Sequence, residues 1–398
     1  MKIGLIITPY KYEELEKEEM IPINYERSWL QNVNPKFIIE EDDTEWVTDD
    51  IAIYYYLKET FKNKYIIEYI MGNDPLIYEK VKRCDVVFLL IFDMVEAFHT
   101  LSQSEFKEMK RTFMLPNVYP PYLFQNFINN KNKYYDYLKE KGINVLPMVY
   151  ISSDEFKKNP KACVEKVLTI KRGDDQAFIG KPIFGQEMID FEVFDKNTKD
   201  YKVIKYLERI TALYDGCIFQ PYIKYLAKNY EFRVYFIGDK YYYTIRTKYL
   251  KEDNTFESKF MNMDEYTDNI QVLQFAKKVF SQLPKLKMGK KYVDKLVTRI
   301  DISCCFENQR FFVSEIEFVP SLFSNQKQVA DLMIDKIIGD QLIKIVQQLD
   351  IKSIQPLQNK YIPLIIGSCI LFFIILFIIL ILVIFLPKNK KYFNLRIG

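Results

Sequence analysis

The chain has 398 residues, a formal net charge of +3, 27% charged residues and 49% hydrophobic residues, a composition typical of folded proteins rather than disordered ones. Its single histidine excludes chemistry that needs several imidazoles, and its interleaved acidic and basic residues argue against a nucleic-acid-binding surface. The six cysteines contain no C-x-x-C pair, so we expect free thiols in a reducing compartment rather than zinc ligands.

The first 116 residues alternate between apolar strands and amphipathic helices. The sequence predicts strands at 2–8, 36–40, 64–72 and 85–93, with helices from about residue 49 and at 75–83. This alternation is typical of a parallel α/β domain. The proline-rich stretch 115–124 interrupts the pattern, and we place a domain boundary at 116.

Two further units are predicted, 117–220 and 221–350, which gives an overall α/β fold with α+β lobes. In the first unit we expect helices at 132–142, 152–171 (interrupted by Pro160) and 200–214, and strands at 143–151, 176–182, 188–195 and 216–223. In the second we expect strands at 230–238, 240–250, 295–306 and 310–318 and helices at 264–283 and 325–349. Gly238 and Asp239 are predicted to form a tight hairpin turn.

Three carboxylates stand out near the end of the second unit. Glu315 and Glu317 are two residues apart in a predicted strand, so both side chains point to one face. Asp301 lies in the preceding strand, and a hairpin between the two strands would bring all three together. Carboxylates that close repel unless a cation neutralises them, and hard oxygen ligands suit Mg²⁺. The alternative is a solvated strand face with unrelated acids.

Basic residues in earlier elements favour a magnesium site over a solvated strand face. Lys181 ends a predicted strand, Lys133 lies at the start of a helix, and Arg233 and Arg246 lie in the middle of consecutive strands. A charge inside apolar sequence must either reach solvent or meet an anion. Acids for Mg²⁺ together with cations for phosphate oxygens are the components of a nucleotide site.

The order of these basic and acidic residues along the chain, together with the short motifs around them, resembles the ATP-grasp superfamily, in particular glutathione synthetase-like ligases. The resemblance covers about residues 117–349. Residues 1–116 resemble the pre-ATP-grasp domain. The resemblance implies that NNKNKYYDYLKEKGINVLP supplies a phosphate-binding lysine, Lys133 or alternatively Lys131, and that FIGKP supplies Lys181. It also implies a hinge whose backbone binds the adenine edge, formed by Gln220, Pro221, Tyr222 and Ile223.

The same resemblance assigns the remaining candidates. Arg233 and Arg246 would stabilise the transferred phosphate, and the phrases RID and EIEFVP would make Asp301, Glu315 and Glu317 the Mg²⁺ ligands. The chain departs from the family pattern at two points. The phosphate-covering segment IFGQEMID contains only Gly185, and Glu317 stands where many relatives have Asn.

The function implied is that of an ATP-dependent ligase that activates a small-molecule carboxylate as an acyl phosphate for attack by an amine or a thiol. Two alternatives remain open. The chain would be an inositol polyphosphate kinase if the acceptor were a phosphorylated polyol, or a nucleotide-binding scaffold if the glycine-poor segment reflects lost turnover.

Residues 362–386 contain no charge and are long enough to cross a membrane. We expect a single C-terminal anchor, preceded by a linker at 351–361 and followed by a basic tail at 387–398, with the large domain facing the cytosol. The positive-inside rule mildly opposes this orientation, because the tail carries more lysine and arginine than the other flank. A buried core helix is the alternative for this segment.

Overall fold

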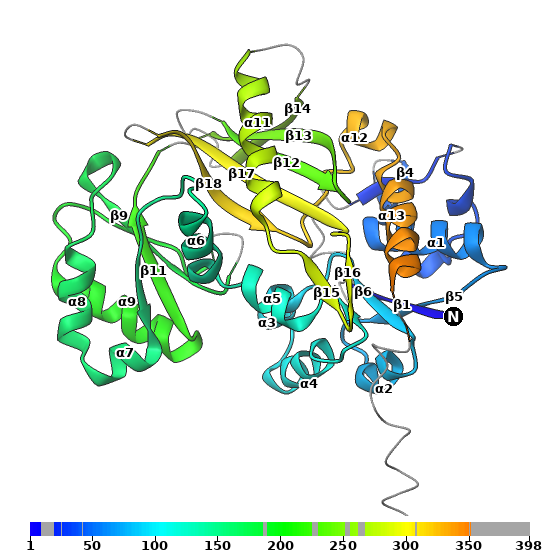
Figure 1. Cartoon of the computed structure of the whole chain (residues 1–398), viewed down its shortest axis with the longest axis horizontal. Coiled ribbons are helices and arrows are strands. Elements are labelled where there is room, and N and C mark those ends of the chain that lie inside the picture. Colours follow the sequence, from blue (N-terminus) through cyan, green and yellow to red (C-terminus); the bar gives the residue numbers. More distant parts are fainter. Residues whose placement is uncertain are drawn as a thin grey trace, which may run out of the picture. The chain divides into compact units, whose positions relative to one another are not determined.

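The computed structural model describes residues 1–8, 20–24, 26–41, 43–185, 189–224, 230–250, 255–261, 267–306, 309–349 and 351. Residues 1–354 form one compact unit (Figure 1). The predicted membrane span at 362–386 and the basic tail lie outside the described residues, as does all of the predicted linker except residue 351. Among the helices that are described, none has the length and apolar character needed to cross a membrane.

The first sheet is parallel, as predicted, with strand order β5-β1-β6-β7. Its strands are β1 (Lys2–Ile7), β5 (Ile66–Met71), β6 (Val86–Leu89) and β7 (Val118–Tyr119). Four helices belong to the same region: α1 (Asp49–Phe61), α2 (Ile77–Lys82), α3 (Met94–Thr100) and α4 (Gln103–Phe113). Strand β7 extends this sheet past the boundary expected at 116, and α3 and α4 were not predicted.

A small antiparallel sheet precedes α1. It consists of β2 (Met20–Pro22), β4 (Thr44–Thr48) and β3 (Ile39–Glu41), in that order. The strand predicted at 36–40 is only partly formed, because Pro35–Phe37 make a 3-10 turn in which the Asn34 side chain accepts a hydrogen bond from the Lys36 amide. Proline fixes φ at a value that suits the first position of such a turn.

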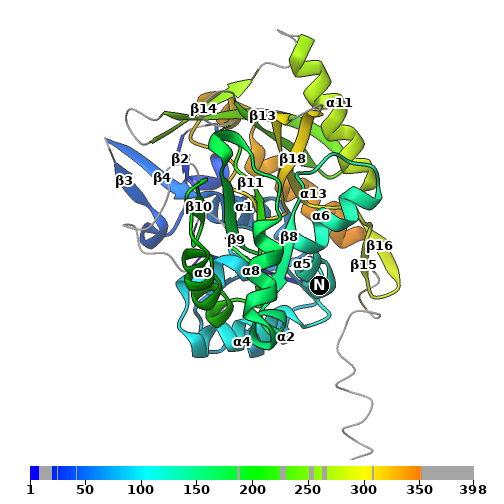
Figure 2. The ribbon, with the colours of Figure 1, turned by 90° about the vertical axis from the view of Figure 1, so that its left-hand side faces the viewer.

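The second sheet is antiparallel, with strand order β10-β9-β11-β8. Its strands are β8 (Val149–Ser152), β9 (Phe178–Pro182), β10 (Glu192–Phe194) and β11 (Gly216–Pro221). Helices α8 (Pro160–Leu168) and α9 (Asp200–Leu213) lie beside this sheet (Figure 2). Phe178 and Phe219 share a hydrophobic core with side chains of both helices. The helix predicted at 152–171 divides at Pro160 into α7 (Ser153–Lys158) and α8.

Side chains alternate between the two faces of the sheet along β9 and β11, so the residues that face away from α9 can be identified. Gly180 is paired with Phe219, whose side chain lies in the core shared with α9, and a Cβ added to Gly180 would stand 2.7 Å from Tyr206 of α9. Lys181 and Gln220 are each one residue further along, so they point to the opposite face.

The third sheet is also antiparallel, with order β14-β13-β12-β17-β18. Its strands are β12 (Glu231–Ile237), β13 (Lys240–Leu250), β14 (Thr255–Met261), β17 (Val297–Phe306) and β18 (Gln309–Glu317), and α11 (Thr267–Gln282) packs on it. The predicted turn between β12 and β13 is confirmed, with Gly238 at φ 62°. A hairpin of β15 (Leu286–Met288) and β16 (Lys291–Val293) follows α11.

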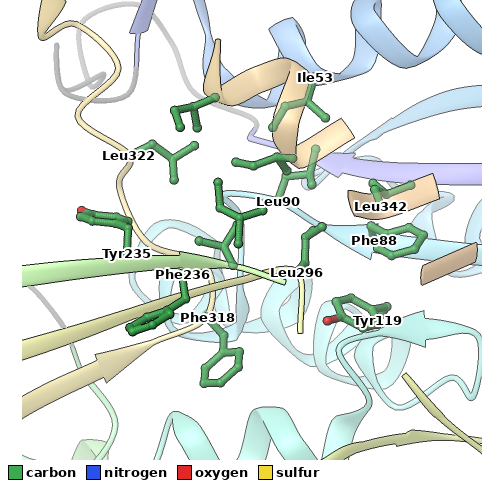
Figure 3. Close-up of a cluster of buried hydrophobic side chains, with 14 of the residues drawn as sticks. Ile53, Phe88, Leu90, Tyr119, Tyr235, Phe236, Leu296, Phe318, Leu322 and Leu342 are labelled. Carbon is green, nitrogen blue, oxygen red and sulfur yellow. The ribbon is translucent and has the colours of Figure 1, made fainter. Parts of the chain in front are cut away.

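Helices α5 (Tyr122–Ile128) and α6 (Lys131–Glu140) connect the first sheet to the second. The helix predicted at 325–349 is two helices, α12 (Lys327–Asp331) and α13 (Ile334–Gln348), because Met333 adopts a left-handed conformation with φ 55°. Helix α13 returns to the first region and packs on α1. Figure 3 shows the resulting core, in which Ile53 of α1, Phe88 of β6 and Leu342 of α13 come together with Leu322 and Tyr235.

Four cysteines whose side chains the structure describes are free thiols, as predicted: Cys84, Cys163 and Cys217 are buried and Cys304 is partly buried.

Candidate active site

Strands β17 and β18 bring the three predicted carboxylates together. Asp301 lies opposite Glu315 in the ladder, and a ligand oxygen from each of Asp301, Glu315 and Glu317 lies within 4.8 Å of the others. Two oxygens on opposite sides of a magnesium ion stand about 4.2 Å apart, because each Mg–O distance is about 2.1 Å. The spacing of these oxygens is therefore close to that of the ligands of a magnesium ion. The expectation that these acids share one face is met.

A β-bulge at Ser314 sets this alignment. The register changes between Asp301 and Ile302, so that Ser314 is the extra residue of β18. Its hydroxyl donates to Glu231 at 2.8 Å, and its carbonyl accepts a hydrogen bond from the Tyr135 hydroxyl of α6. The bulged residue is thus held from two other elements, which fixes the position of Glu315 next to it.

Arg299 is a site residue that the sequence analysis missed. It lies opposite Glu317 in the ladder, and its guanidinium donates to Asp301 at 2.8 and 2.9 Å and to Glu317 at 2.5 Å. Its side chain is only 7% exposed. The motif RID already indicated that Arg299 could belong to the site. Like Arg233, Arg299 is a charged residue inside an apolar strand, and it lies two residues from Asp301, on the same face.

Of the two candidate lysines on α6, the structure brings Lys131 to the cluster and not Lys133. The Lys131 ammonium lies 2.5 Å from Glu315 and donates to the Gly185 carbonyl at 2.7 Å. Lys133 is exposed and donates to the Asn126 side chain at 3.0 Å. Successive residues of a helix are rotated by about 100°, so two residues later the side chain points in another direction. The geometry therefore corrects the first choice and favours the alternative.

Lys181 approaches the same carboxylates from the second sheet. Its ammonium lies 5.6 Å from the centre of the Tyr135 ring. Burial and the nearby Lys131 lower the pKa of Lys181 to about 8, against the attraction of Glu315 and Glu231. A lysine with a lowered pKa, facing a second lysine, forms a region of positive potential that suits an anion.

The carboxylates have different electrostatic environments. Burial opposes ionisation of Glu315, but Lys131 and Lys181 outweigh that effect and lower its pKa. Burial dominates at Glu317 and raises its pKa, because the attraction of Arg299 is offset by repulsion from Glu315 and Asp301. A divalent ion would relieve this repulsion.

A fourth carboxylate of the site, Glu231 of β12, was not predicted from the sequence. It is buried, accepts hydrogen bonds from Ser314 at 2.8 Å and Ser303 at 3.3 Å, and lies 3.8 Å from the Arg233 guanidinium. Burial and the neighbouring Asp301 raise its pKa. Glu231 lies two residues before Arg233 in the same strand. This spacing alone predicts that the two side chains share one face of the sheet.

The structure separates the two predicted arginines. Arg233 pairs with Asp301 across the β12–β17 ladder and so shares its face, and its Nε lacks a hydrogen-bond partner among the described residues. Arg246 pairs instead with Phe232, which puts it on the opposite face, where its guanidinium lies 4.4 Å from the Tyr230 ring centre. Arg246 is therefore not part of the cluster, contrary to expectation.

A bulge explains why Arg246 lies on the wrong face. The β12–β13 register shifts between Tyr235 and Phe236, which leaves Tyr242 as an extra residue in β13. If Tyr242 were paired with Tyr235 in a regular ladder, Arg246 would pair with Glu231 and face the cluster. A shift of one residue moves every later side chain to the other face of the sheet, and the sequence gives no sign of it.

The predicted hinge is braced at Tyr222. The Tyr222 amide donates to the Ala177 carbonyl at 3.2 Å, and the Tyr222 carbonyl accepts from the Asp174 amide at 2.6 Å. Backbone groups alternate in direction along an antiparallel strand, so those of Pro221 and Ile223 point the other way, past the end of β8. Of the four predicted hinge residues, the Pro221 carbonyl and the Ile223 amide are therefore the groups that can meet an adenine edge.

The hinge side chains complete this region. Ile223 packs on a small apolar cluster of Leu146 and Phe312. Gln220 is buried and faces the same side as Lys181, and its Nε2 has no hydrogen-bond partner among the described residues. An apolar surface beside outward-facing backbone groups suits a planar base.

Comparison with known proteins adds the fold class. No family model and no curated protein matches the chain. Solved structures that it resembles include a synthetase and a ligase, and the likeness to the first of these indicates an ATP-grasp-type fold. One is D-cycloserine synthetase DcsG, with a TM-score of 0.55 and 18% identity over 73% of this chain and 93% of that one. Another is the D-alanine–D-alanine ligase of Bacillus anthracis complexed with ATP, with a TM-score of 0.49 and 15% identity over 87% and 97% of the two chains.

Proposed function

We propose that this protein is an ATP-dependent ligase that activates a small-molecule carboxylate. The observation that carries the proposal is the meeting of Asp301, Glu315 and Glu317 of the third sheet with Lys131 and Lys181 from other elements. Acidic groups for a divalent ion and cations for phosphate oxygens on facing elements are what phosphoryl transfer requires. The ATP-grasp-type fold supports the same conclusion.

We assign the following roles in binding and catalysis to side chains and hinge backbone groups of this chain. Lys131 and Lys181 bind phosphate oxygens, and the Pro221 carbonyl and Ile223 amide orient the base. Arg233 and Arg299 lie beside the carboxylates, where negative charge develops as a carboxylate oxygen of the substrate attacks the γ-phosphorus and ADP leaves. An amine or thiol then attacks the acyl carbon, and phosphate leaves.

Asp301, Glu315 and Glu317 would hold Mg²⁺, which when bound neutralises charge on the phosphates. Glu317, once a bound cation favours its ionised form, adds a negative charge that an amide at that position would lack. Arg246 has no part in this proposal, because it lies on the other face of its sheet.

The test is ADP formation by the purified protein with Mg²⁺, ATP and pools of candidate carboxylates and amines. We expect ADP release that depends on both acceptors and falls at least 100-fold in Lys181→Met and Glu315→Gln, because each variant removes a charge from the site. Lys133→Met is the matched control, since the Lys133 side chain is exposed and its ammonium donates to Asn126 away from the carboxylates, and it should retain full activity.

Other outcomes would favour the alternatives. Phosphate transfer from ATP to an inositol polyphosphate, without a carboxylate requirement, would replace the ligase by a kinase. ATP binding without ADP formation under any acceptor condition would indicate a nucleotide-binding module, in agreement with the glycine-poor segment after Lys181.

We further propose that residues 362–386 anchor the protein in a membrane with the large domain in the cytosol. The support is the uncharged apolar run of the sequence. Alkaline carbonate extraction tests it: the natural chain should stay in the membrane pellet, and Leu376→Lys combined with Ile375→Lys should move it toward the soluble fraction. Equal distribution of both chains would contradict the anchor.

A further inference from the structure

Lys131 joins parts of the molecule that belong to different sheets. Its backbone amide donates to the Ile183 carbonyl at 2.9 Å, and its ammonium donates to the Gly185 carbonyl at 2.7 Å. These two carbonyls belong to the segment directly after β9 and Lys181. The same ammonium lies 2.5 Å from Glu315 of β18. One lysine therefore ties the segment that would cover the phosphates to a carboxylate of the candidate metal site.

The candidate metal ligands are already paired with protein cations in this state. Lys131 contacts Glu315, and Arg299 contacts both Asp301 and Glu317. The Lys131 and Arg299 side chains are 11% and 7% exposed, whereas Glu315 and Glu317 are 30% and 27% exposed. The two cations are therefore poorly solvated, and water screens these pairs only in part. A divalent ion arriving alone would have to displace Lys131 from Glu315, which leaves a poorly solvated ammonium without its partner.

A nucleotide changes this balance because its phosphates offer Lys131 another partner. Lys131 and Lys181 stand close enough for their repulsion to lower the pKa of Lys181. An anion between them relieves that repulsion. If the Lys131 ammonium moves from Glu315 to a phosphate oxygen, it loses no charge pairing, and the Glu315 carboxylate becomes free for the metal.

We propose that Lys131 is a latch between the two sheets that controls the order of binding. Without nucleotide, it holds the segment at 183–185 against Glu315 and blocks that carboxylate from divalent ions. With nucleotide, it transfers to the phosphates, and the metal takes its place at Glu315. This inference rests on the proposed function, because it assumes that metal and nucleotide bind between these sheets.

The first test measures Mn²⁺ binding without nucleotide, by electron paramagnetic resonance at pH 7.5, on the full-length protein in detergent micelles. Lys131→Met should bind Mn²⁺ about tenfold more tightly than the natural protein, because the competing cation is gone. Lys131→Arg keeps the charge and should bind as weakly as the natural protein, and so should Lys133→Met. Glu315→Gln combined with Lys131→Met should lose the gain. Equal or weaker Mn²⁺ binding by Lys131→Met would overturn the latch.

The second test measures amide hydrogen exchange, without metal or nucleotide, at Ile183, whose amide donates to the Gly216 carbonyl at 3.2 Å in the segment that Lys131 holds. Lys131→Met should increase exchange at least fivefold, because the bond to the Gly185 carbonyl is lost, and Lys133→Met should not. Unchanged exchange in Lys131→Met would overturn the latch. If no variant binds Mn²⁺ even with a non-hydrolysable ATP analogue, the proposed function fails. The two failures are therefore distinguishable.

Discussion

At the scale of single residues, Asp49 is the group whose state is most tied to the fold. It lies at the start of α1 with 1% exposure, near Asp335, Asp50 and Arg27, and neither of its oxygens has a hydrogen-bond partner among the described residues. Burial raises its pKa from the ordinary 3.8 to about 8, and the nearby Ser324 opposes that rise only in part. Asp49 is therefore largely protonated in the fold at neutral pH.

This state predicts how stability depends on pH. Since the folded pKa lies above the unfolded one, the fold binds an extra proton between pH 4 and about 8, and this contribution to stability is lost as the pH rises through that window. Asp49→Asn should remove the loss, so its advantage over the natural protein should be small at pH 4 and grow steadily up to pH 8, by about 1.4 kcal/mol for each pH unit within that window. Urea unfolding at several pH values measures it. A gain that does not grow with pH would contradict the prediction.

Gly173 offers a second prediction at this scale. A Cβ at this position would stand 2.0 Å from the Tyr222 carbonyl oxygen, which is part of the braced hinge. Gly173→Ala should lower the free energy of unfolding by about 2 kcal/mol or more and weaken ATP binding, because the hinge must move. Gly142→Ala is the matched control: it has a left-handed backbone but open space, and should cost about 1 kcal/mol with ATP affinity unchanged. Calorimetric titration with ATP separates the two.

At the scale of elements, two β-bulges decide which side chains form the site. The bulge at Ser314 keeps Glu315 opposite Asp301, and the bulge at Tyr242 turns Arg246 away from Arg233. The sequence shows the strands but not their extra residues, because both bulges lie inside regular apolar patterns.

Arg233 and Arg246 lie on opposite faces of the same sheet, so their variants form a matched pair. Arg233→Met should lower the rate of ADP formation at least 100-fold, since Arg233 lies beside Asp301 and Glu231. Arg246→Met should change that rate less than threefold, because the side chain stacks on Tyr230 on the far face. Similar losses in both variants would show that the register is different in the working enzyme.

The packing of α13 on α1 gives a prediction about stability. Gly339 lies against the Tyr56 ring, where an added Cβ would stand 2.5 Å from a ring carbon, and the Tyr56 hydroxyl donates to Asp340 at 2.6 Å. Gly339→Leu should separate the helices and cost about 3 kcal/mol. Lys336→Leu, at an exposed position of the same helix, should stay within about 0.5 kcal/mol of the natural protein. Thermal unfolding of both variants measures the difference.

At the scale of the whole molecule, the sequence predicted the parallel first region and most strands and helices of the other two, because their apolar periodicity is strong. It also placed Asp301, Glu315, Glu317 and Lys181 in one site. It missed α3 and α4 and the division of the last helix at Met333, where the left-handed backbone leaves no mark in the apolar pattern.

The site assignments that changed share a physical cause. Lys133 gave way to Lys131 because helix rotation, which depends on where α6 begins, selects the residue that faces the cluster. Arg246 faces away from the cluster because β13 carries an extra residue at Tyr242. Register and helix phase are set by tertiary packing, and the pattern of a single segment does not contain them.

The central claim is that the carboxylates of β17 and β18 hold the divalent ion of a nucleotide bound opposite Lys181. The most direct measurement is a crystal structure with Mn²⁺ and a non-hydrolysable ATP analogue, using anomalous scattering to locate the metal. We expect an anomalous peak about 2.2 Å from oxygens of Asp301 and Glu315, with the Lys181 ammonium on a phosphate oxygen. A nucleotide bound elsewhere, or a peak away from these carboxylates, would contradict it.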